Sequence, residues 1–143
     1  MMEVSQKLID FTRQSEGFRA EPYMDNGSLA IGYGHHGAEV KRGLVWTEKQ
    51  ADAVQRRDFA EFGRQVESLV KVPLTQGQFD ALVDFVYNLG SGRLQHSTLL
   101  DLLNKKQYAS AGQQLIRWDN NNGKSDDNLL ARRRQELQLF WNS

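Results

Sequence analysis

The chain has 143 residues, 39% of them hydrophobic and 25% charged, which is typical of one globular domain with a substantial core. Its 18 basic and 18 acidic side chains give a formal net charge of zero, so nothing in the charge indicates nucleic acid or an anionic membrane as a partner. The absence of cysteine excludes disulfides and thiolate metal sites. Residues 1–12 lack a continuous apolar stretch, so we expect neither a secretory signal nor a transmembrane helix there.

The first part of the chain predicts a short helix followed by a small antiparallel sheet. Apolar residues at helical spacing predict an amphipathic helix over about residues 3–15, with Glu16 at its carboxyl end. Residues 18–35 carry aromatic and β-branched positions interrupted by the dipeptide Asn26-Gly27. Both residues of that dipeptide tolerate a positive φ, so it predicts the turn of a β-hairpin.

The remainder of the chain predicts helices. Thr47 with Gln50 forms a capping box that opens a long helix to about residue 70, and Thr75 with Gln78 opens a second to about residue 89. The expected starts of later, shorter helices are Ser97 or Thr98, Gln107 and Asn128, with a polar loop over residues 119–128.

The helix that begins after Thr75 is apolar on nearly every face, which predicts that other helices surround it. Its polar residues Asp80, Asp84 and Asn88 recur at every fourth position. Such a stripe suits either a cation site or, more commonly, a face wetted by solvent, and we expect the wetted face.

Glu16 and Asp25 are the candidate catalytic carboxylates. Glu16 follows a helix that must bury its apolar face and precedes an aromatic residue, surroundings that suit a general acid. Asp25 lies beside an exposed turn and suits a base or an electrostatic stabiliser. Paired carboxylates across a cleft are what glycosidic-bond hydrolysis requires. From spacing alone, the alternative is that Glu16 is a helix-terminal charge and Asp25 a turn former.

Residues around both acids match the pattern of a known family. The pattern Glu-Gly-x-Arg, Tyr-x-Asp, Gly, Ile-Gly-x-Gly-His is met by Glu16, Gly17, Arg19, Tyr23, Asp25, Gly27, Ile31, Gly32, Gly34 and His35. Later matching segments are 47–51, 78–83, 87–90, 97–100, and Arg132, Arg133, Glu136 and Phe140. Over essentially its whole length the chain therefore resembles the phage-type lysozymes, the endolysins of glycoside hydrolase family 24.

The resemblance implies a mainly α, α+β fold with two lobes. A small antiparallel-sheet lobe over about residues 12–60 is expected to be joined by a long helix to a helical lobe. That helical lobe would comprise about residues 61–143 together with the first helix, in one lysozyme-like domain spanning residues 1–143. Substrate would lie in the cleft between the lobes.

The resemblance also implies a muramidase, which cleaves the β-1,4 bond between N-acetylmuramic acid and N-acetylglucosamine in peptidoglycan without a cofactor. The implied mechanism is inverting, with Glu16 as acid, Asp25 helping to activate a water, and the carboxyls about 6.5–9.5 Å apart. In the family an arginine from the C-terminal segment pairs with the catalytic glutamate, and Arg132 is the best match. The residues expected to bind substrate or support the site are Tyr23, His35, His36, Thr98 and Arg132.

The chain departs from the family pattern at Ala30, where the family carries a threonine whose hydroxyl shares in holding the attacking water. A methyl group neither donates nor accepts a hydrogen bond. We expect reduced rather than absent activity, because Asp25 remains and Ser28 or His36 can supply a substitute contact. Two alternatives stay open: a lysozyme-fold protein that binds glycan or serves as a scaffold without cleaving it, and a laboratory variant weakened on purpose.

The adjacent histidines His35 and His36 invite a metal site, but adjacent residues of a strand point to opposite faces and do not readily chelate one ion. His96 is distant in sequence, so no metal site is expected. His35 is expected to form a hydrogen bond with the backbone or with a carboxylate near the cleft. His36 is expected to face the sugar groove.

The expected partner is peptidoglycan, with no nucleic acid, no stable membrane insertion and a monomeric protein. Without a signal peptide, the chain would be made in the host cytoplasm. It would depend on a separate holin to reach the cell wall in the periplasm, which is an implication of the family.

Overall fold

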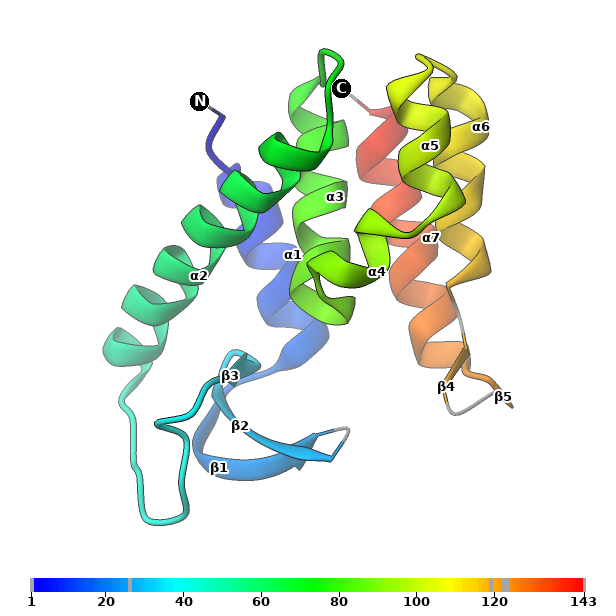
Figure 1. Cartoon of the computed structure of the whole chain (residues 1–143). Coiled ribbons are helices and arrows are strands. Elements are labelled where there is room, and N and C mark those ends of the chain that lie inside the picture. Colours follow the sequence, from blue (N-terminus) through cyan, green and yellow to red (C-terminus); the bar gives the residue numbers. More distant parts are fainter. Residues whose placement is uncertain (1, 26, 119, 122–123, 143) are drawn as a thin grey trace.

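The computed structural model describes residues 2–25, 27–118, 120–121 and 124–142. It is a mainly helical α+β fold with two lobes, as predicted (Figure 1). The strands are β1 (Arg19–Asp25), β2 (Ser28–Gly32), β3 (His35–His36), β4 (Asn120–Asn121) and β5 (Lys124–Ser125). The helices are α1 (Gln6–Glu16), α2 (Glu48–Leu69), α3 (Gln76–Leu89), α4 (Ser91–Gln95), α5 (Thr98–Asn104), α6 (Tyr108–Gln114) and α7 (Asp127–Trp141), with a 3₁₀ helix η1 (Leu115–Arg117).

The small lobe is built on an antiparallel sheet in the order β1-β2-β3. Tyr23 lies opposite Ala30, Asp25 lies opposite Ser28, and Ala30 lies opposite His36. Residues directly opposite each other on neighbouring strands project from the same face of a sheet. Side chains of all five residues therefore share one face. In the predicted turn between β1 and β2, Asn26 lies outside the described residues.

The long helix α2 runs from the loop after the sheet up to the helical lobe (Figure 1). The predicted capping box is confirmed: the Thr47 side chain accepts from the backbone N–H of Gln50, and the Gln50 side chain accepts from the backbone N–H of Thr47. These contacts satisfy donors that the first turn of a helix otherwise leaves unpaired. The equivalent capping box at the start of α3, between Thr75 and Gln78, is also confirmed.

Helix α3 lies at the centre of the helical lobe, among α1, α2, α4 and α7, as its apolar sequence predicts (Figure 1). The core around it consists of buried apolar residues from most helices, among them Leu8, Ile9, Phe59, Val66, Phe79, Leu82, Phe85, Leu99, Leu103, Leu115 and Phe140. Helix α1 thus packs against the helical lobe through Leu8 and Ile9, while its last residue reaches the sheet.

The expectation of a solvent-wetted stripe on α3 is wrong. Asp80 and Asp84 are both buried, and polar groups from other segments form hydrogen bonds with their carboxylates. The Asp80 carboxylate accepts from the hydroxyl of Ser5, and Asp84 accepts from Thr12 and Arg132. Helical periodicity alone does not reveal that a neighbouring helix supplies these partners.

Two short elements differ from the sequence prediction. Helix α4 was not predicted, and it has no side-chain cap, but its residue Leu94 is fully buried in the core. Within the predicted loop over residues 119–128, β4 and β5 pair as a two-stranded antiparallel sheet, and residues 119, 122 and 123 lie outside the described part of the chain. None of the helices described here is both long and apolar enough to span a lipid bilayer.

Candidate active site

Glu16 is the last residue of α1, and its side chain is 15% exposed. Gly17 ends the helix with a φ of 71° and donates its N–H to the carbonyl of Arg13. The turn between β2 and β3 then passes directly under Glu16. A Cβ atom at Gly34, where φ is +87°, would lie 2.7 Å from Glu16 Oε1. Glycine at position 34 therefore permits both the turn and the close approach of the carboxylate.

The guanidinium of Arg132, from the first turns of α7, contacts Glu16 from the helical lobe. Its Nη1 donates to Glu16 Oε2, while its Nε and Nη2 each donate to Asp84 at 2.9 Å. Thr12 Oγ1 donates to the same Asp84 carboxylate at 2.9 Å. Asp84 thus fixes the planar guanidinium from behind and leaves one edge of Arg132 for Glu16.

The electrostatics of this buried group favour a charged Asp84. Burial by itself raises the pKa of Asp84, but the charge of Arg132 and the hydrogen bonds to the carboxylate hold that pKa well below its usual range. The neighbouring Glu136 behaves in the opposite way. Burial raises the pKa of Glu136 well above its ordinary value, and the hydrogen bond with Asp84 adds to this although Arg133 opposes it. The Glu136 carboxyl itself is contacted by Arg133, whose Nη2 lies 2.8 Å from Glu136 Oε2.

Asp25 ends β1 on the sheet face defined above. His36 Nε2 lies 3.0 Å from Asp25 Oδ2, and His36 Nδ1 lies 2.8 Å from the hydroxyl oxygen of Ser28. Ala30 is 0% exposed, and its cross-strand neighbours are Tyr23 on β1 and His36 on β3.

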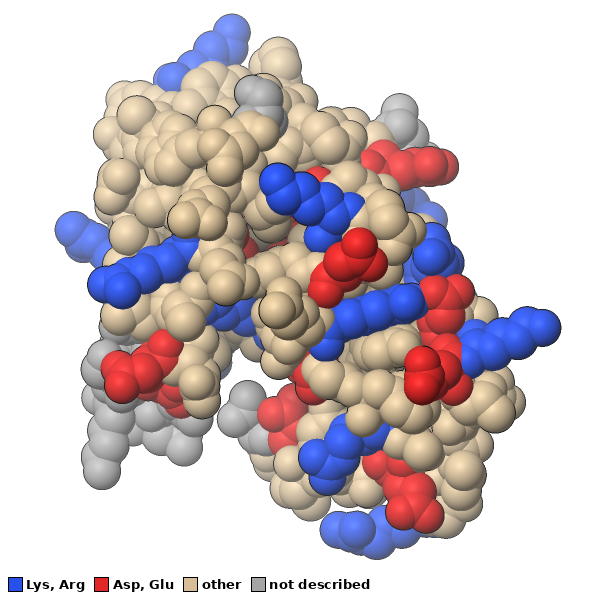
Figure 2. Space-filling model, turned by 180° about the vertical axis from the view of Figure 1, so that it is seen from behind, with Lys and Arg blue, Asp and Glu red and all other residues tan. Residues whose placement is uncertain are grey.

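Tyr23 brings the two carboxylates into one site. The pKa of its hydroxyl is raised to about 12, first by burial and then by the negative charges of Glu16 and Asp25, while Arg19 opposes the shift. On the sheet, Tyr23 shares the face of Asp25, two residues before it on β1. Figure 2 shows the surface hollowed between the sheet-bearing lobe and the lower end of the helical lobe, with acidic and basic side chains interspersed around it.

His35 holds the sheet to the long helix rather than contacting either acid. Its Nδ1 lies 2.6 Å from Asp58 of α2, and its Nε2 lies 2.6 Å from Glu39. Carboxylates only accept hydrogen bonds, so an imidazolium satisfies both contacts. Burial lowers the pKa of His35, but the hydrogen bonds and charges of Asp58 and Glu39 outweigh burial, and the net shift is upward.

We therefore expect the stability of the protein to fall as pH rises past about 6.5, the unfolded pKa of histidine. A raised folded-state pKa contributes stability that is fully present below that value and is lost as pH rises through the folded pKa of His35. Thermal unfolding midpoints measured between pH 5 and 9 check this. His35→Gln should flatten the profile, whereas His96→Gln, at an exposed position, should leave it unchanged. An equally steep profile in His35→Gln would contradict the assignment.

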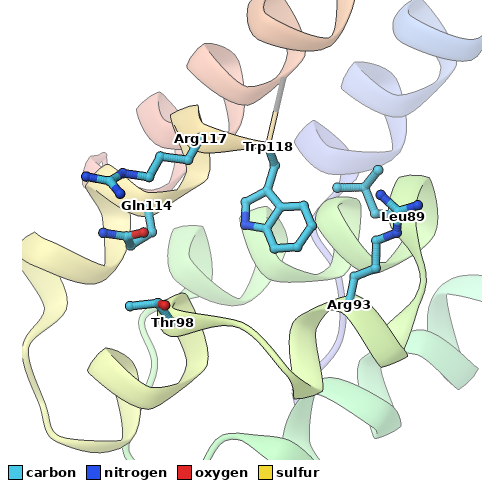
Figure 3. A pocket seen from close by; sticks show the side chains of 6 residues that line it. All are labelled: Leu89, Arg93, Thr98, Gln114, Arg117 and Trp118. Atoms are coloured by element: carbon cyan, nitrogen blue, oxygen red, sulfur yellow. The ribbon is translucent and has the colours of Figure 1, made fainter. Parts of the chain in front are cut away.

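Thr98 lies in a cavity of the helical lobe with a volume of about 360 Å³, and neither acid lines that cavity. The Trp118 indole projects into its centre, and the guanidinium groups of Arg93 and Arg117 lie on opposite sides (Figure 3). The remaining lining residues are Leu89 and Gln114.

The sequence analysis named Asp84 and Glu136 without assigning them to the site, and it did not name Asp58. An acid in the middle of an otherwise apolar helix was a usable signal for Asp84, because such a residue must find a buried partner. Nothing in the sequence marked Asp58 as the partner of His35. Over the described ranges, no cluster of three or more histidine, aspartate and glutamate side chains is arranged to hold a metal ion.

Comparisons with known proteins identify the family and the fold of this chain. The phage lysozyme family model matches residues 13–136. The endolysin of Bacillus phage B103 is 40% identical over 142 residues, covering 97% of this chain but 54% of that protein, so the chain spans about half its length. The endolysin of Salmonella phage P22 is 36% identical over 145 residues, covering 98% of this chain and 99% of that protein. The muramidase domain of SpmX from Asticaccaulis excentricus superposes with a TM-score of 0.89 at 32% identity, covering 99% of each chain. The chain belongs to the phage lysozyme family.

Proposed function

We propose that this chain is a muramidase that hydrolyses the β-1,4 bond between N-acetylmuramic acid and N-acetylglucosamine in peptidoglycan. The observation that carries the proposal is the placement of Glu16 and Asp25. One acid closes a helix and is held by Arg132, the other lies on the sheet face, and the charges of both reach the hydroxyl of Tyr23. Two carboxyls on different elements of one site are the requirement for glycoside hydrolysis.

In the proposed reaction Glu16 donates its proton to the bridging oxygen as the bond from that oxygen to the anomeric carbon breaks. A water attacks the anomeric carbon from the opposite face of the sugar, and Asp25 accepts the proton that this water loses. The product sugar has the inverted configuration. Once Glu16 has lost its proton, the guanidinium of Arg132 stabilises the resulting carboxylate.

The substrate class is supported by the cavity around Trp118. Peptidoglycan differs from uncharged glycans in the carboxylates of its muramic acid and stem peptides. Arg93 and Arg117 present two guanidinium groups beside an aromatic surface, and guanidinium groups pair with carboxylates in fixed geometry.

Digestion of purified peptidoglycan tests the proposal. We expect new reducing ends that borohydride converts to muramitol and not to glucosaminitol, and a product that is first released as the α-anomer. A retained β-anomer would contradict the inverting mechanism. A chain that binds peptidoglycan but releases no reducing ends would instead be a non-catalytic glycan-binding protein.

We further propose that the chain acts as a monomer and reaches the wall through a separate holin, a proposal supported only by the family resemblance. Cells that express this chain alone should keep their turbidity until chloroform permeabilises the membrane. Lysis without permeabilisation would show another route to the wall.

A further inference from the structure

We infer that His36, oriented by Ser28, is a positioning residue that orders Asp25 and so compensates for the water-holding hydroxyl that Ala30 lacks. The inference rests on the proposed function, because it concerns how Asp25 is prepared to accept a proton from water. It assigns a role to two residues of the sheet face that lie beside Asp25.

The contacts form a continuous chain across three strands. Ser28 Oγ lies 2.8 Å from His36 Nδ1, and His36 Nε2 lies 3.0 Å from Asp25 Oδ2. Ser28 is the cross-strand partner of Asp25, and His36 is the cross-strand partner of Ala30. His36 therefore lies opposite Ala30 on the neighbouring strand, and its imidazole contacts the carboxylate of Asp25.

Hydrogen-bond chemistry fixes the direction of the contact with Asp25 and, for a neutral imidazole, that of the contact with Ser28. A carboxylate only accepts, so His36 Nε2 must carry the hydrogen that it shares with Asp25. In the neutral imidazole, Nδ1 is then an acceptor, and the hydroxyl of Ser28 donates to it. This arrangement sets both the tautomer and the ring orientation of His36. The contact engages Asp25 Oδ2, and in this proposal Oδ1 is the oxygen that accepts the proton of the attacking water.

The burial of Ala30 supports the inference that His36 compensates for the threonine hydroxyl that the family carries at position 30. Ala30 is 0% exposed, and its cross-strand neighbours are Tyr23 and His36. The larger threonine side chain would need additional space at this buried position. A hydroxyl at position 30 would hold the attacking water itself, whereas the imidazole at position 36 orders the carboxylate that accepts a proton from that water.

The first test is the kinetics of His36→Ala on purified peptidoglycan. We expect kcat to fall about 10–100-fold, because a misplaced catalytic group costs this much in rate, with KM and the unfolding midpoint nearly unchanged. His36→Gln should regain part of the loss, since its amide N–H can donate to Asp25. Ser28→Ala should lose less than His36→Ala, and the double variant should be no slower than His36→Ala alone. His96→Ala is the matched control and should keep the parent kcat.

The second test introduces the missing hydroxyl. Ala30→Thr should bring no gain in the parent chain, where His36 already orders Asp25, but should restore most of the kcat lost in His36→Ala. A purely structural role for His36 predicts no such rescue. Two results would overturn the inference: a parent-like kcat in His36→Ala, or an Ala30→Thr/His36→Ala variant as slow as His36→Ala alone. An inactive parent chain would contradict the proposed function instead, so the two failures are distinguishable.

Discussion

Glu16→Gln is expected to remove wall lysis almost completely, with a rate loss of at least about 10²–10⁴-fold. Glutamine keeps the length and shape of the side chain, and its amide oxygen can still accept from Arg132, but it has no proton to give the leaving oxygen. Turbidity loss of outer-membrane-permeabilised cells measures the effect directly.

The control for this experiment is Glu3→Gln, which removes one negative charge at an exposed position before α1 and should leave lysis unchanged. The unfolding midpoint of Glu16→Gln, measured alongside, distinguishes loss of chemistry from loss of fold. Lysis at the parent rate in a folded Glu16→Gln would mean that another group donates the proton.

Asp84→Ala is expected to destabilise the protein by about 3–5 kcal/mol, the range found when one partner of a buried ion pair is removed. Asp84 is fully buried and accepts two hydrogen bonds from Arg132. The substitution leaves the guanidinium of Arg132 buried without its main anchor and the hydroxyl of Thr12 without its acceptor. Urea unfolding at neutral pH measures the loss.

The same variant should also be less active in its folded state, because Arg132 no longer has a fixed position against Glu16. Asp84→Asn keeps the side-chain volume and one acceptor oxygen, so it should lose less stability and less activity than Asp84→Ala. Asp101→Ala, at an exposed position of α5, should change the free energy of unfolding by no more than about 0.5 kcal/mol. If Asp84→Ala is as stable as Asp101→Ala, the buried network does not anchor Arg132.

Much of the fold was predictable from the sequence because its signals are local. The capping boxes before α2 and α3 depend on side chains three residues apart, and the burial of α3 follows from its apolar composition. Elements without such local signals were missed. Helix α4 depends on the burial of Leu94, and the β4–β5 pairing depends on a short polar segment with no alternating pattern.

The sequence by itself determined the helical character of the chain, the position of Glu16 at a helix end and that of Asp25 beside a predicted turn, since spacing and turn chemistry act over a few residues. Only the tertiary structure decided what surrounds these acids. Arg132 reaches Glu16 across 116 positions of sequence, and His36 reaches Asp25 across 11. Contacts of this kind depend on how separate elements pack, and no local pattern encodes which distant side chain will fill the space beside a carboxylate.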